Sequence, residues 1–90
     1  MSKVNLIRGA ILAALPDANV SVIDPYSDGE HFQAIVVSEQ FVGKSLVKQH
    51  QLVMNSLKEA FYTDVHALGL KTFTPSAWET QHHLYPSITF

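Results

Sequence analysis

Three consecutive segments decide the fold of this chain: HFQAIVVS (31–38), SLVKQHQLVMNSLKEAF (45–61) and VHALGLKTF (65–73). The first and third segments read as strands, and the first is especially rich in the β-branched residues that favour strands. The middle segment reads as a helix, because side chains recur along one side of it at helical spacing, namely Leu46, His50, Val53, Leu57 and Phe61. A strand, a full helix and a second strand in this order have the length of a parallel crossover. We therefore predict that the two strands are parallel neighbours.

The residues before this unit predict a helix and a further strand. An apolar stripe at helical spacing, made of Val4, Ile7, Ile11 and Ala14, predicts a helix that ends at about Leu15. A β-branched run over Asn19–Asp24 predicts a strand. Pro25–Glu30 between this run and the next has the composition of a turn, so we expect these two strands to pair antiparallel.

The residues after this unit predict one short helical turn and a tail. Thr74 can cap the turn, with Pro75 at its first position. We expect the indole of Trp78 to pack against the domain and to anchor this turn. The last residues show no periodicity, which indicates a loosely held tail. The predicted organisation is a domain over residues 1–80 and a tail over 81–90.

Composition bounds the class of protein. Ninety residues with 47% hydrophobic and 16% charged side chains are typical of one folded globular domain. The formal net charge of −2 gives no electrostatic case for a nucleic-acid or membrane surface as partner. Cysteine is absent, so no disulfide framework exists. We find no apolar run of about 20 residues that could cross a bilayer and no signal peptide, and we expect a cytoplasmic protein.

Two histidines are the candidate metal ligands. His31 opens the first of the two parallel strands and His66 opens the second. Neighbouring strands lie about 4.8 Å apart, so the two imidazoles could reach a common metal centre. Imidazole suits Zn, Cu and Fe, and histidine can replace cysteine on one iron of a two-iron cluster. Two ligands cannot close a structural zinc site, so a partner must complete the site. The alternative is that both are half-exposed histidines with local hydrogen bonds.

The other three histidines have simpler interpretations. His50 lies within the apolar stripe of the long helix, where a buried, hydrogen-bonded core histidine is expected. His82 and His83 are adjacent in the tail, and neighbouring residues do not face each other on a helix or a strand. We expect both to be solvated.

A basic and polar face on the long helix is the candidate nucleic-acid surface. It contains Lys44, Lys48 and Lys58, and lysines of this kind could contact phosphates. A solvated helix face explains the same residues. Motifs for nucleophilic or metal-dependent hydrolysis are absent from the sequence, so we expect no enzyme activity.

The chain resembles the BolA-like proteins from about Leu6 to Glu79. Four spaced blocks in the same order carry this resemblance: residues 15–18 (LPDA), 28–38 (DGEHFQAIVVS), 41–53 (FVGKSLVKQHQLV), and 66–78 from His66-Ala67-Leu68 to Thr74-Pro75-x-x-Trp78. The resemblance implies an α+β fold of the class II KH-like type. In that fold a three-stranded mixed sheet, with its second and third strands parallel, packs helices on one face.

The resemblance also implies a function. BolA-like proteins are partners of monothiol glutaredoxins, which share a 2Fe-2S cluster with them through a cysteine and glutathione. His66 matches the family's cluster histidine, and His31 matches a position that carries His or Cys. The implied role is a non-enzymatic iron–sulfur adaptor in cluster trafficking or iron regulation, with no cluster bound by the isolated chain. The absence of cysteine agrees with a partner that supplies the sulfur.

The family also suggests an alternative, a nucleic-acid-binding transcriptional regulator that uses the KH-like fold. The basic Arg-His-Arg that the family usually has around the helix histidine is Gln49-His50-Gln51 here, which weakens this alternative. The sequence leaves open whether the chain forms a homodimer.

Overall fold

The computed structural model describes residues 3–61, 68–88 and 90. Its elements follow the order α1 (Lys3–Ala14), β1 (Asn19–Ile23), β2 (Phe32–Val37), the 3-10 turn η1 (Glu39–Phe41), α2 (Leu46–Phe61), β3 (Leu68–Phe73), α3 (Pro75–Gln81) and the 3-10 turn η2 (His82–Leu84). The predicted helices and strands are therefore present, and their boundaries agree to within one residue wherever the predicted boundary lies in the described residues.

The three strands form one mixed sheet in the order β1-β2-β3. β1 runs antiparallel to β2, so that Asn19 lies opposite Val37. β2 and β3 are parallel, and their register begins with Phe32 opposite Leu68. The predicted α+β class and the predicted parallel crossover are confirmed. Because parallel strands start at the same edge, the N-terminal ends of β2 and β3 lie together.

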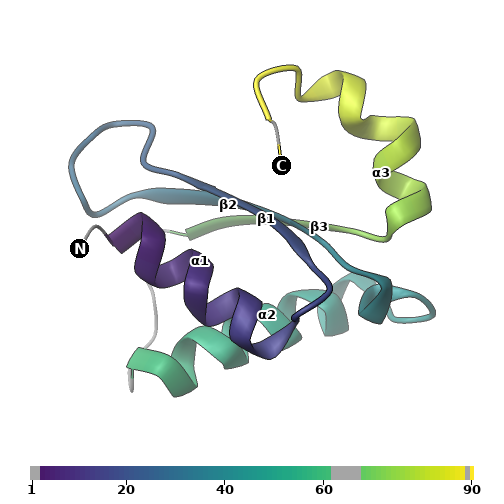
Figure 1. Cartoon of the computed structure of the whole chain (residues 1–90), viewed down its shortest axis with the longest axis horizontal. Coiled ribbons are helices and arrows are strands. Elements are labelled where there is room, and N and C mark those ends of the chain that lie inside the picture. The colour runs from purple at the N-terminus through teal and green to yellow at the C-terminus, as the bar shows by residue number, and fades with distance from the viewer. Residues whose placement is uncertain (1–2, 62–67, 89) are drawn as a thin grey trace.

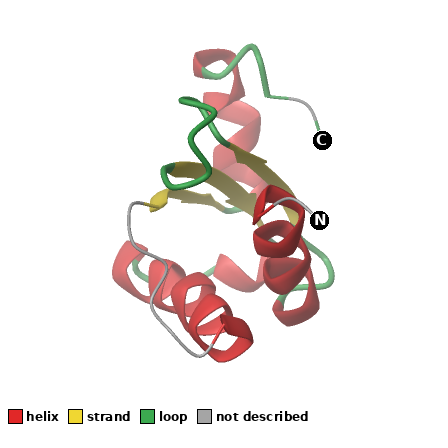
Figure 2. Cartoon of the chain, turned by 90° about the vertical axis from the view of Figure 1, so that its left-hand side faces the viewer, coloured by secondary structure: helices red, strands yellow, loops and turns green. Residues whose placement is uncertain are grey.

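One face of the sheet is covered by α1 and α2 (Figures 1 and 2). α1 contributes its buried stripe residues Ile7 and Ile11. α2 contributes Val53 and Leu57, both fully buried. From the sheet itself, alternate residues of each strand point into this core, since successive side chains leave a strand on opposite faces. This layer is the main hydrophobic core.

The first turn of α2 departs from the sequence prediction. The helical spacing places Leu46 on the apolar side of the helix, but Leu46 is 60% exposed and its neighbour Val47 is 66% exposed. The periodicity was correct for the middle of the helix and wrong for its first turn, because α2 begins beyond the edge of the buried layer. Val42, just before the helix, is 63% exposed as well.

The opposite face of the sheet is covered by α3 and the C-terminal residues (Figures 1 and 2). The buried residues Ile35, Val37 and Phe73 form a second, smaller core with side chains that follow β3. Thr74 caps α3 by accepting a hydrogen bond from the N–H of Ala77 at 3.2 Å, and Pro75 is its first residue. The prediction that the helices pack on one face therefore holds for α1 and α2 and is wrong for α3.

Two side chains of the C-terminal segment, Tyr85 and Ile88, pack on this second core, although the sequence there shows no periodicity. The division into a domain over residues 1–80 and a tail over 81–90 stays a prediction. The Trp78 indole lies 5.2 Å from the Phe73 ring and stacks on Tyr85 at 5.8 Å, measured between ring centroids. This confirms that Trp78 packs against the domain. Among the described residues, no helix is long and apolar enough to cross a membrane.

Candidate metal-ligand loop

The loop between β1 and β2, residues 24–31, positions the exposed histidine of the candidate site. Asp24 organises its first half, because its carboxylate accepts hydrogen bonds from the N–H groups of Asp28 at 3.3 Å and Gly29 at 2.9 Å. Aspartate side chains commonly stabilise turns in this way. Ser27 and Gly29 have positive φ angles of 53° and 69°. The loop is thus a tight, locally hydrogen-bonded turn.

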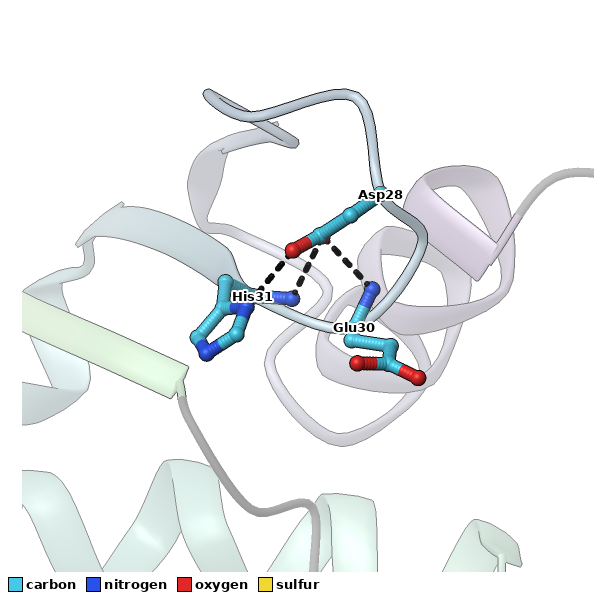
Figure 3. Close-up of side chains that lie close together, drawn as sticks. All are labelled: Asp28, Glu30 and His31. Carbon is cyan, nitrogen blue, oxygen red and sulfur yellow. Dashed lines mark hydrogen bonds and ion pairs between the residues drawn. The ribbon is translucent and has the colours of Figure 1, made fainter.

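Asp28 organises the second half of the loop (Figure 3). Its Oδ1 accepts hydrogen bonds from the N–H groups of Glu30 at 2.9 Å and His31 at 3.0 Å. Its Oδ2 lies 2.7 Å from Nδ1 of His31. Both oxygens are therefore used within the loop. The other ring nitrogen of His31, Nε2, points away from Asp28 (Figure 3).

These contacts change the electrostatics of both side chains. The backbone N–H groups of Glu30 and His31, and then the imidazole, hold the pKa of Asp28 far below its usual range. The hydrogen bond that the Asp28 carboxylate accepts from the ring raises the pKa of His31 above its ordinary value. Asp28 is accordingly ionised at neutral pH. The His31 side chain is 53% exposed, so its ring is accessible to a partner.

His31 lies at the edge where β2 and β3 begin. It directly precedes Phe32, the first residue of β2, and Phe32 pairs with Leu68, the first residue of β3. His66 is two positions before Leu68 in the sequence, outside the described residues. His31 is half-exposed and makes local hydrogen bonds to Asp28, as the alternative interpretation expects. That His31 and His66 share one site stays a prediction.

Asp28, Glu30 and His31 also form a small cluster of ligand-type side chains. One ligand atom from each lies within 4.8 Å of the others, and all three residues are exposed. Since both oxygens of Asp28 already accept hydrogen bonds inside the loop, the groups of this cluster that face solvent are the imidazole of His31 and the carboxylate of Glu30 (Figure 3). The sequence interpretation selected His31 and overlooked Asp28. The signal that could have found it is the Asp-x-x-His spacing in a turn.

The other predicted residues lie away from this loop. His50 on α2 is partly buried, so the expected core position is met only in part. His82 and His83 are exposed, as expected. Lys44, Lys48 and Lys58 are exposed as well. Ten residues separate Lys48 from Lys58, which corresponds to about 15 Å along the helix axis. The three lysines are therefore spread out.

The comparisons with known proteins agree with this architecture. The family model described as BolA-like protein matches residues 15–77. The chain is 36% identical over 80 residues to the DNA-binding transcriptional regulator BolA of Escherichia coli K12, covering 81% of this chain and 76% of the relative. It is 37% identical over 81 residues to the acid stress protein IbaG of the same organism, covering 89% of this chain and 93% of the relative. A solved BolA homologue from Coxiella burnetii superposes with a TM-score of 0.71 at 36% identity, covering 88% of this chain and 99% of that one.

This chain belongs to the BolA-like protein family. None of these three relatives is named as an enzyme.

Proposed function

We propose that this chain is a non-enzymatic adaptor that shares a 2Fe-2S cluster with a monothiol glutaredoxin, in cluster trafficking or iron regulation. The observation that carries the proposal is the placement of His31. Its ring is exposed at the edge where two parallel strands begin, and its Nε2 points out of the loop. The family resemblance assigns His66, near the start of the neighbouring strand, as the second nitrogen ligand.

The donor set fits a shared cluster. A 2Fe-2S cluster has four ligands besides its sulfides, and histidine can replace cysteine on one of its irons. This chain contains no cysteine, so it can offer imidazole nitrogens and no thiolate. The remaining ligands would come from the cysteine of the glutaredoxin and from glutathione. For the same reason the isolated chain is expected to hold no cluster. The compartment that we propose for the chain is the cytoplasm.

Reconstitution tests this proposal. The purified chain is mixed with a monothiol glutaredoxin, glutathione, iron and sulfide, and the visible absorption and CD spectra are compared with those of the glutaredoxin alone. We expect a stable complex of the two proteins with a distinct cluster spectrum. If the spectrum is that of the glutaredoxin cluster and no complex forms, the proposal fails.

A second candidate function rests on one specific observation. A relative 36% identical to this chain is named a DNA-binding transcriptional regulator. The charges of this chain argue against a strong electrostatic contribution, because the formal net charge is −2 and the three lysines are spread out. Nucleic-acid binding through lysine–phosphate contacts would weaken steeply as salt concentration rises. Cluster sharing would depend instead on the imidazoles and on the thiol partner.

A further inference from the structure

The short contact between Asp28 and His31 determines which nitrogen of the ring can bind a metal. A neutral imidazole carries one N–H and one lone pair, and only the nitrogen with the lone pair can be a ligand. An ionised carboxylate only accepts hydrogen bonds. At 2.7 Å from Asp28 Oδ2, Nδ1 of His31 must therefore carry the proton. The lone pair is left on Nε2, the nitrogen that points out of the loop (Figure 3).

The carboxylate is itself held in place. Its Oδ1 accepts two backbone N–H groups, at 2.9 and 3.0 Å, which stabilise the ionised form. The backbone N–H of Asp28 donates in turn to Asp24. On the ring, Tyr26 makes an edge contact with His31 at 5.8 Å between centroids and an interplanar angle of 85°. The orientation of the imidazole is thus determined by two separate contacts.

We infer that Asp28 is a positioning residue that fixes His31 as the Nδ1–H tautomer and so presents the Nε2 lone pair to a metal centre. Carboxylates that accept the second N–H of a metal-binding histidine are a recurrent device, because they fix the tautomer and the ring direction together. The tautomer itself follows from the contacts of the loop. Its use by a metal rests on the proposed function.

Asp28→Asn is the informative substitution. The amide oxygen can keep the two backbone hydrogen bonds that Oδ1 accepts, while the amide NH₂ replaces Oδ2 opposite Nδ1. A donor at that place favours the lone pair on Nδ1 and moves the proton to Nε2. Asp28→Ala removes both oxygens. Glu30→Gln is the matched control, because it removes one negative charge from the same loop without changing the acceptor of the ring.

The measurement is a long-range 1H–15N NMR correlation of the isolated chain, at a pH well above the pKa of His31. His31→Ala identifies the ring signals among those of the five histidines. We expect protonated Nδ1 and unprotonated Nε2 in the wild type and in Glu30→Gln, and a reversed majority tautomer in Asp28→Asn. A wild-type ring protonated on Nε2, or an unchanged tautomer in both Asp28 variants, would overturn the inference.

A second arm uses the complex reconstituted with a monothiol glutaredoxin. Asp28→Asn should shorten the cluster lifetime in the same direction as His31→Ala, by up to about tenfold, which is the lower end of typical losses at such positions. Suppose that Asp28→Asn reverses the tautomer, but neither Asp28→Asn nor His31→Ala changes the cluster lifetime. Asp28 then does fix the tautomer of His31, and the proposed cluster role of His31 fails. If His31→Ala alters the cluster and Asp28→Asn does not, the positioning role fails.

Discussion

Phe32 lies opposite Leu68 in the parallel register of β2 and β3, and this pair marks the edge at which both strands begin. His31 directly precedes Phe32, so its exposed imidazole lies at that edge, at the end of a short hydrogen-bonded loop. The β2–α2–β3 crossover is what brings the two strand entries together. Among the described residues, the fold thus places the exposed imidazole of His31 at this end of the sheet.

Removal of the exposed imidazole of His31 should affect the cluster but not the stability of the fold. His31→Ala is expected to leave the melting temperature nearly unchanged, because the ring is 53% exposed and contacts only its own loop among the described residues. It should shorten the lifetime of the cluster in the complex with glutaredoxin. Thermal unfolding by CD and the decay of visible absorption measure the two effects. His83→Ala, an exposed histidine of the C-terminal segment, is the matched control and should change neither quantity.

Trp78 should contribute strongly to stability. Its indole packs against Phe73, Tyr85 and Phe90, and truncation would remove the centre of the second core. Full burial of an aromatic side chain would predict a loss of about 3–5 kcal/mol. Because Trp78 is only partly buried, we expect about 2–3 kcal/mol and a melting temperature lower by about 10 °C or more for Trp78→Ala. An unchanged melting temperature would show that this core contributes little to stability.

Asp17 should make stability depend on pH. Its carboxylate accepts hydrogen bonds from the buried Ser38 hydroxyl at 3.0 Å and from the N–H of Glu39 at 2.9 Å. Partial desolvation opposes the shift, but these bonds and one from Gln40 lower the pKa of Asp17 in the folded state. The stabilisation is therefore present above the unfolded-state pKa, about 3.9, and is lost as pH falls through the lowered folded pKa.

Asp17→Asn should then cost about 1 kcal/mol at neutral pH, a value discounted for solvent screening. Urea unfolding at several pH values measures the difference between the two proteins. The difference in the free energy of unfolding between the wild type and Asp17→Asn should shrink as pH falls below about 4. Glu39→Gln, which alters an exposed neighbouring carboxylate, should cost little. A penalty for Asp17→Asn that stays constant down to low pH would contradict the assigned role of the charge.

The lysines should matter little for cluster sharing. Replacing Lys44, Lys48 and Lys58 by glutamine should leave the cluster spectrum unchanged. If the chain does bind DNA, the plot of log K against log salt should have a slope no steeper than about −3 from these residues, and the triple variant should flatten it. Filter binding across a salt series tests this. Strong DNA binding that the triple variant leaves intact would rule out this surface.

Local patterns predicted most of the fold and part of the site. The strand–helix–strand unit could be inferred because its periodicities are strong and its connection has the length of a crossover. Thr74 and Pro75 predicted the start of α3 from the capping chemistry of the helix N-terminus. His31 was found because it opens a strand whose partner could be inferred.

Other features depend on contacts between distant residues. Tyr85 and Ile88 pack on Ile35 and Val37, about fifty residues earlier in the chain, and no local period signals this. The exposure of Leu46 depends on where the sheet ends and not on the helix itself. The hydrogen bond that His31 donates to Asp28 depends on the backbone geometry of the turn, including the positive φ of Gly29. Sequence periodicity contains none of this information.

The central claim is that imidazole nitrogen from this chain binds the shared cluster. Pulsed EPR of the reduced complex tests it most directly, with only the histidines of this chain labelled with 15N and the glutaredoxin unlabelled. We expect strong 15N couplings of the size that iron-bound imidazole gives. They should be weakened by His31→Ala, weakened further by His66→Ala, and lost when both histidines are replaced. A reduced cluster with no strong 15N coupling in the wild-type complex would contradict the account.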